Sequence, residues 1–196
     1  MGARERFIES IEYLRKMGFF EEYCNLSSEE IFEKIRENSI ALKYLGVKEV
    51  EERWMKESVY EVDSFIAIFD KRRVLGKDVE VVGPEKGLST EIFKEIVRIS
   101  RGVFQPTDIE EEWLGHNTRI HFTFRGKRHV IDFCFYTDLL QINPIMRRIN
   151  SLIEDTGYQY YELLDGNQTF FAVVLTREEA EKLIRERGWK ISCKWG

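Results

Sequence analysis

The chain has 196 residues, of which 43% are hydrophobic and 13% aromatic, a composition typical of a folded globule rather than a disordered chain. Its formal net charge of -5 is spread along the chain and argues against a dedicated nucleic-acid-binding protein, because such proteins carry a net basic surface for phosphate contacts. The longest apolar runs, at 65–69 and 170–175, are too short to span a bilayer.

Helix is the dominant pattern at the start of the chain. Apolar residues recur at helical spacing from Phe7 to Leu14, and Gly18 is placed to end that helix. Ser27 and Glu30 form the pattern of a capping box, in which each side chain bonds the backbone amide of the other residue. We therefore expect a second helix to begin directly after Ser27.

The next segment, 38–76, has a less uniform pattern. Its first half, 38–58, predicts further helix that is broken near Gly46. Its second half contains the apolar run FIAIF, which fits either a buried strand or a helix that begins at Asp63. We favour the helix for this run.

A stretch rich in turn residues, KDVEVVGPEKG at 77–87, follows the helical segments. It alternates briefly and then closes in Gly-Pro and Gly signals, which is the pattern of a domain boundary. We therefore predict a mainly helical part over 1–84 and an α+β domain with an antiparallel sheet over 85–196. The alternative is one continuous domain.

Strands and helices alternate in the rest of the chain. A helix should begin at Ser89, which we expect to cap it, with Leu88 and Phe93 packed against each other across the helix start. The further predicted elements are strands at 107–114, 118–125 and 128–137, a helix from Pro144 to Thr156 capped by Asn143, a hairpin turning at Asp165 and Gly166, a helix opened by a capping box of Thr176 and Glu179, and a last strand at 189–195. Together they predict an α+β fold with a mainly antiparallel sheet, in the order β-meander, helix, hairpin, helix and strand, behind a largely helical N-terminal part.

The predicted meander has one apolar and one polar face. If residues 126–127 form its second turn, His121 lies opposite Asp132. With residues 116–117 in its first turn, Glu112 lies opposite His121, and the carboxylates of the first strand stay away from the phenylalanines. The apolar face then consists of Ile120, Phe122, Phe124, Ile131, Phe133 and Phe135.

This pairing places Glu112, His121 and Asp132 in one row across three neighbouring strands. Two carboxylates beside an imidazole are a ligand set that divalent metal ions accept, and they could also position a general base. The alternative is a row of cross-strand ion pairs on a solvated sheet, in which each pair contributes about 0.2–1 kcal/mol. The candidates for binding an anionic substrate are three arginines of these strands, Arg119, Arg125 and Arg128.

No other catalytic motif is recognisable in the sequence. The glycine-containing turns lack the spacing of phosphate-binding loops, the three histidines lack HExxH spacing, and no serine lies in a GxSxG elbow. The three cysteines are too scattered for a disulfide framework, and the charged N-terminus lacks the apolar core of a signal peptide. We therefore expect a soluble, cytoplasmic protein of bacterial or archaeal type, without a membrane anchor or a resident cofactor.

These absences favour a non-enzymatic interaction or regulatory module that binds a protein partner rather than nucleic acid. The first alternative is a metal-dependent hydrolase or nuclease that uses Glu112, His121 and Asp132, and only this alternative needs a divalent metal. The second alternative is a domain that senses a small ligand in a pocket between sheet and helices. The enzyme differs from the other two because it predicts three side chains that converge in a cleft.

Overall fold

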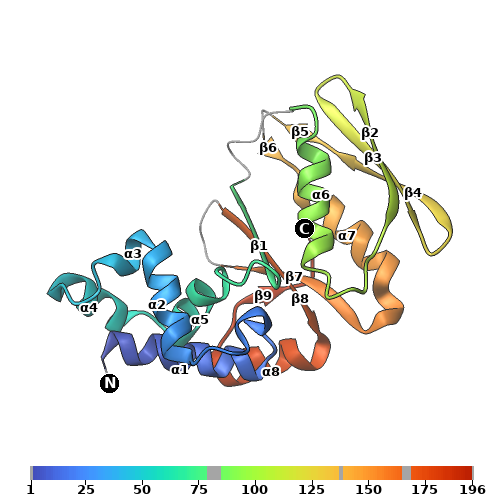
Figure 1. Cartoon of the computed structure of the whole chain (residues 1–196). Coiled ribbons are helices and arrows are strands. Elements are labelled where there is room, and N and C mark those ends of the chain that lie inside the picture. Colours follow the sequence, from blue (N-terminus) through green and yellow to red (C-terminus); the bar gives the residue numbers. More distant parts are fainter. Residues whose placement is uncertain (1, 79–84, 137–138, 165–168, 196) are drawn as a thin grey trace. The chain divides into compact units, whose positions relative to one another are not determined.

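The structure is a computed structural model, which describes residues 2–78, 85–136, 139–164 and 169–195 (Figure 1). It has an α+β fold with antiparallel sheets and a helical N-terminal part, as predicted. Within the described part of the chain, no helix is both long and apolar enough to cross a membrane.

The chain divides into two compact units. The helical unit consists of Met1–Lys71 together with Glu181–Lys190, and the sheet unit consists of Arg72–Ala180 together with Ile191–Gly196. The division precedes the first strand rather than following it, because Val74 pairs with Val173 in an antiparallel ladder of the sheet unit. The predicted boundary at residue 84 lies outside the described residues, as does the predicted turn at Asp165 and Gly166.

Short helices make up the first part of the helical unit. They are α1 (Ala3–Lys16), η1 (Glu21–Tyr23), α2 (Ser28–Asn38), α3 (Ile40–Lys43), α4 (Lys48–Lys56) and α5 (Val59–Ala67). The capping box before α2 is confirmed: the Ser27 amide donates to Glu30 Oε2 at 2.7 Å, and the Glu30 amide donates to Ser27 Oγ at 3.2 Å. Helix α5 begins after Ser58, whose capping box with Glu61 was not predicted, and not at Asp63.

In the residues of the sheet unit that are described, the strands form three antiparallel sheets with the orders β1-β8-β7-β9, β2-β3-β4 and β5-β6. Its strands are β1 (Val74–Asp78), β2 (Thr107–Leu114), β3 (Asn117–Phe124), β4 (Lys127–Phe133), β5 (Phe135–Tyr136), β6 (Leu139–Leu140), β7 (Tyr158–Leu163), β8 (Thr169–Thr176) and β9 (Ile191–Ser192). Its helical elements are α6 (Leu88–Arg98), α7 (Ile142–Ile153) and η2 (Glu154–Thr156), and α8 (Arg177–Arg187) begins in this unit and continues into the helical unit. The predicted capping box of α8 is confirmed, because the Thr176 amide donates to Glu179 Oε2 at 2.8 Å and the Glu179 amide donates to Thr176 Oγ1 at 3.1 Å.

The core of the sheet unit lies between its sheets and the helices α6 and α7. The apolar face of β3 and β4 is buried against these helices, as the alternation of residues predicted (Figure 1). An aromatic cluster forms its centre, in which the Phe93 ring of α6 lies 5.0 Å from the Phe122 ring and 5.8 Å from the Phe104 ring. The outer face of the β2-β3-β4 sheet is thereby left exposed.

A side chain of β2 caps helix α6, and the prediction that Ser89 is the cap is wrong. The helix begins after Gly87, and the hydroxyl of Ser89 is buried in a hydrogen bond with Thr118. Glu111 instead accepts hydrogen bonds from the amides of Gly87 at 2.8 Å and Thr90 at 3.0 Å. Burial by itself would raise the pKa of Glu111, but these hydrogen bonds and those from the side chains of Thr90 and Trp113 hold that pKa below its ordinary value.

The Glu111 cap should make the stability of the sheet unit sensitive to acid. A carboxyl group whose pKa is lowered by folding stabilises the fold above its unfolded pKa of about 4.5, and this contribution is lost as the pH falls through the lower folded value. We expect Glu111→Gln to lower the free energy of unfolding at pH 7 by about 1–2 kcal/mol and to flatten its decline between about pH 5 and pH 3. Urea unfolding of both proteins across this pH range measures the effect, and an equally steep decline in the variant would contradict it.

Helix α7 also begins earlier than predicted and covers a strand edge. It starts at Ile142, so Pro144 lies within its first turn and Asn143 is not its cap. The side chain of Asn150 accepts from the amide of Tyr160 at 2.8 Å and donates to its carbonyl at 3.0 Å. This side-chain amide thus pairs with the backbone of β7 in the way a neighbouring strand would.

Candidate functional site: the outer face of the meander

The second turn of the meander lies one residue earlier than predicted. Phe124 pairs with Lys127, so the turn consists of Arg125 and Gly126, with φ angles of 50° and 73°. Two positive φ angles are those of a type I' turn, which matches the twist of the flanking strands. Each residue of β3 therefore pairs with a residue of β4 that lies two positions earlier than predicted. Each side chain keeps its predicted face of the sheet but has a different partner.

Arginine, rather than histidine, occupies the middle of the predicted row. Arg119 lies opposite Asp132 on one side and opposite Glu112 on the other, whereas His121 lies opposite Glu110 and Val130. The predicted opposition of His121 to Glu112 and Asp132 is therefore wrong. We call the exposed and half-buried residues of this sheet surface the meander face: Glu110, Glu112, Arg119, His121, Thr123, Arg128, Val130 and Asp132.

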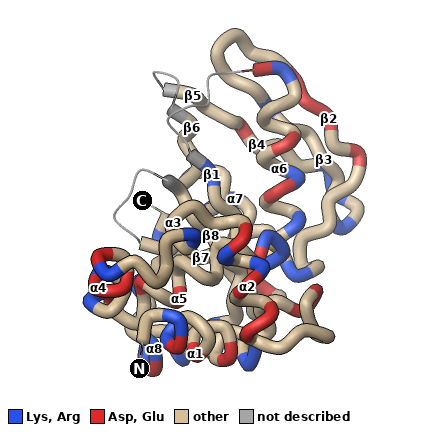
Figure 2. Tube along the Cα trace, turned by 60° about the vertical axis from the view of Figure 1, so that its left-hand side comes forward, with Lys and Arg blue, Asp and Glu red and all other residues tan. Residues whose placement is uncertain are grey.

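Acidic and basic residues lie on the neighbouring strands of the meander face (Figure 2). Arg119 Nε lies 2.6 Å from Asp132 Oδ1, and Arg119 Nη1 lies 4.0 Å from Glu112 Oε2. The hydrogen bond to Asp132 and the charge of that carboxylate raise the pKa of Arg119. His121 is diagonal to Glu112, and its Nε2 lies 2.8 Å from Glu112 Oε2.

The predicted metal ligands do not form one cluster. In the part of the chain that the structure describes, no group of three or more His, Cys, Asp or Glu side chains is placed to hold a metal ion. The guanidinium of Arg119 lies where a divalent ion would have to approach Glu112 and Asp132 together. The contact of His121 with Glu112 still has the geometry of a carboxylate that orients an imidazole, which is an arrangement that general bases use.

The three arginines that were candidates for binding an anion each contact an acidic side chain of this chain. Arg128 pairs with Glu110, and it also donates from Nη1 to the carbonyl of Asp108 at 3.0 Å. Arg125 lies outside the meander face, because its Nη1 contacts both carboxylate oxygens of Asp155 in η2 at 2.8 and 2.7 Å. An anionic ligand would have to displace these carboxylates.

The contact between Arg119 and Asp132 should contribute little to stability. Both side chains are well exposed, at 36% and 51%. Exposed ion pairs are screened by water and contribute up to about 1 kcal/mol. We expect Asp132→Asn to lower the free energy of unfolding by less than about 1 kcal/mol in urea unfolding, as should Asp155→Asn at the Arg125 pair. A loss of several kcal/mol would show that the row is a structural element of the fold.

Exposed apolar side chains gather elsewhere, in a segment that the sequence did not single out. Among the described residues, half of the exposed large hydrophobic side chains lie between residues 40 and 59 of the 196. We call these the α3–α4 surface, with exposed fractions of 80% for Ile40, 61% for Tyr44, 47% for Val47, 45% for Met55 and 43% for Val59. They belong to the helical unit, in which α3 and α4 form one end (Figure 1).

The sequence pattern of this surface is one that usually indicates a buried helix face. Ile40, Tyr44 and Val47 recur at the spacing of one helix face, which usually predicts a buried stripe. In the structure α3 ends at Lys43 and α4 begins at Lys48, so the three residues do not share one helix. The break near Gly46 was predicted, and the exposure that follows from it was not.

Charges within the same segment balance. Residues 40–59 contain four Lys or Arg and four Glu, so their formal net charge is zero. Two ion pairs join residues one helical turn apart. Lys48 and Glu52 lie 3.9 Å apart within α4, and Arg53 of α4 lies 3.7 Å from Glu57, the residue that follows the helix. The exposed apolar side chains of the α3–α4 surface therefore lie in a segment without net charge.

Comparison with known proteins adds no family to these observations. No family model matches this chain, and neither the curated proteins nor the solved structures yielded a match.

Proposed function

We propose that this chain is a protein-interaction or regulatory module without catalytic activity, which binds a protein partner through the α3–α4 surface. The observation that carries the proposal is the concentration of exposed apolar side chains between residues 40 and 59, led by Ile40 and Tyr44. Exposed apolar side chains that gather on one part of a surface are typical of binding sites, and aromatic residues such as Tyr44 are favoured in protein interfaces.

The charges of the segment favour a protein partner over nucleic acid or a lipid surface. Binding to phosphates needs unbalanced Lys and Arg, and helices that lie on membranes carry a basic polar face. In α4 the cations of Lys48 and Arg53 lie beside carboxylates of the same chain. The matching partner is a protein surface with apolar side chains and no strong net charge.

The cysteines support a reducing compartment for this function. Cys24, Cys134 and Cys193 are free and exposed, which suits the cytosol better than an oxidising environment. A cytosolic location therefore belongs to the proposal.

The alternative is a hydrolase in which His121, oriented by Glu112, acts as a general base. The contact of 2.8 Å between the two side chains favours it. It predicts a pH-dependent activity that His121→Gln abolishes while leaving the fold intact. The interaction module predicts no such activity.

The experiment that tests the proposal replaces apolar residues of the α3–α4 surface by charge. Tagged wild-type protein, the double variant Ile40→Glu with Tyr44→Glu, and the control Val130→Glu are used to capture partners from cell extract. Val130 is a matched control because it is 39% exposed on the meander face. A captured protein is then purified and titrated against all three forms by calorimetry.

We expect the double variant to bind at least tenfold more weakly than the wild type, because a buried charge at the centre of an apolar interface is costly. Val130→Glu should bind as the wild type does. Equal binding by all three forms would place the interface elsewhere and overturn the assignment of the α3–α4 surface. Sedimentation of the purified chain alone shows whether the partner is a second copy.

A further inference from the structure

The helical unit is assembled from two pieces of chain that lie far apart in the sequence. Residues 72–180, which form most of the sheet unit, separate Met1–Lys71 from Glu181–Lys190. We call Glu181–Lys190 the strap.

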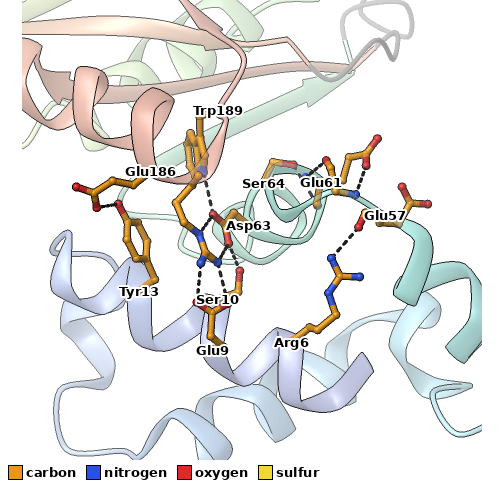
Figure 3. A network of polar contacts seen from close by, with 12 residues as sticks. Arg6, Glu9, Ser10, Tyr13, Glu57, Glu61, Asp63, Ser64, Glu186 and Trp189 are labelled. Carbon is orange, nitrogen blue, oxygen red and sulfur yellow. Dashed lines mark hydrogen bonds and ion pairs between the residues drawn. The ribbon is translucent and has the colours of Figure 1, made fainter. Parts of the chain in front are cut away.

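The strap is anchored by a buried carboxylate (Figure 3). Asp63 of α5 has no exposed surface, and it accepts hydrogen bonds from Arg187 Nε at 2.8 Å, from Arg187 Nη2 at 2.7 Å and from Trp189 Nε1 at 3.1 Å. The hydroxyl of Ser10 in α1 donates to the same carboxylate. One buried side chain thus connects α1, α5 and the strap.

Further contacts follow the strap along its length. Tyr13 donates to Glu186 at 2.9 Å, and the hydroxyl of Tyr60 donates to the carbonyl of Lys190 at 3.3 Å. The buried Trp189 ring lies 6.1 Å from the Tyr60 ring and 6.3 Å from the ring of Phe19. The strap therefore supplies polar and apolar contacts that the first 71 residues do not supply to one another.

Within the sheet unit, the two chain segments that lead to the helical unit lie beside each other. Strand β1 begins at Val74, two residues after the start of this unit at Arg72, and Val74 pairs with Val173 of β8. Strand β8 ends at Thr176 and leads through α8 into the strap. A folded sheet unit therefore brings Lys71 and the start of the strap together without further loss of chain entropy.

We infer that the folded sheet unit keeps the strap in position to dock, so that the helical unit is folded only while the sheet unit is folded. With the sheet unit unfolded, docking the strap closes a disordered loop of roughly 110 residues. The two pieces of the sheet unit are separated by the strap alone, so folding of the sheet unit by itself closes a loop of about ten residues. Closing the loop of roughly 110 residues is about 30-fold less favourable than closing this shorter loop. The sheet unit also has its own extensive core, so it can persist while the helical unit is open.

Pulsed hydrogen exchange with mass spectrometry in a urea series tests this order of unfolding on the full chain. Peptides from 3–16 and 59–67 report on the helical unit, and peptides from 117–133 and 169–176 report on the sheet unit. Phe93→Ala, alone and together with Phe122→Ala, weakens the sheet unit stepwise. Trp54→Ala weakens the helical unit, because the Trp54 ring packs 4.9 Å from the Phe7 ring.

We expect the helical peptides to lose protection at least 100-fold wherever the sheet peptides are unprotected, in every variant and at every urea concentration. Trp54→Ala should produce a range of urea in which only the helical peptides are unprotected. Helical peptides that stay protected after the sheet unit has unfolded would overturn the inference. That test remains informative even if the double variant is unfolded without urea, because the protection of the helical peptides is still measured.

Discussion

Replacing Asp63 by alanine should lower the free energy of unfolding of the helical unit by about 3–5 kcal/mol. The carboxylate is fully buried, and it is the partner of Arg187, whose side chain is only 11% exposed. Burial by itself would lower the pKa of Arg187, but its hydrogen bonds to Asp63 and Glu9 raise it, so the guanidinium stays charged. Without Asp63, a charged group remains in a largely buried site, where the half-exposed Glu9 is its remaining described carboxylate partner and the Tyr13 ring lies 4.6 Å away.

Two further variants identify the cause of that loss. Glu9→Gln removes a partner of Arg187 that is 47% exposed and should cost less than about 1 kcal/mol. Asp63→Ala combined with Arg187→Leu should recover part of the stability that Asp63→Ala loses, because no buried charge is then left unpaired. Urea unfolding followed by hydrogen exchange in α1 measures all three. Additive losses in the double variant would mean that Asp63 acts through packing and not through its charge.

Phe93→Ala should lower the free energy of unfolding of the sheet unit by about 3–5 kcal/mol. The ring is fully buried and lies within 6.5 Å of the rings of Phe104, Phe122 and Phe133. Its removal leaves a cavity between α6 and the inner face of the meander that these rigid aromatic neighbours cannot fill. Lys94→Ala, one residue further along the same helix and exposed, should change stability by less than about 0.5 kcal/mol.

Urea unfolding with a probe in β3 measures both variants of α6. A loss below about 1 kcal/mol for Phe93→Ala would mean that the neighbouring rings collapse into the space, and that α6 does not hold the meander in place.

The two proposals meet in the helical unit. The α3–α4 surface belongs to the unit that the strap completes, so we expect the proposed partner binding to require a docked strap. Loss of binding in Ile40→Glu with Tyr44→Glu tests the surface alone, because these exposed residues lie outside the contacts of the strap. Loss of binding in Asp63→Ala without loss of the sheet unit would test the dependence on the strap.

Local chemistry in the sequence determined where several elements begin and which faces they bury. The capping boxes of Ser27 with Glu30 and of Thr176 with Glu179 involve residues three positions apart, so they form regardless of what packs against the helix. The alternation along β3 and β4 determined the buried face, because successive side chains of a strand point to opposite sides. These features depend on neighbours in the sequence.

Tertiary structure alone decided the features that depend on distant residues. Arg125 adopts a positive φ in the second turn, and this turn places Arg119 opposite Asp132. The first turn also lies one residue earlier than predicted, because Leu114 pairs with Asn117, and this places Arg119 opposite Glu112. Ser89 is drawn into the core by Thr118, and Glu111 from another strand takes over the cap. The anchoring of the strap to Asp63 joins residues 124 positions apart. No local pattern records such pairs, because the energy of burying them arises only when the chain brings them together.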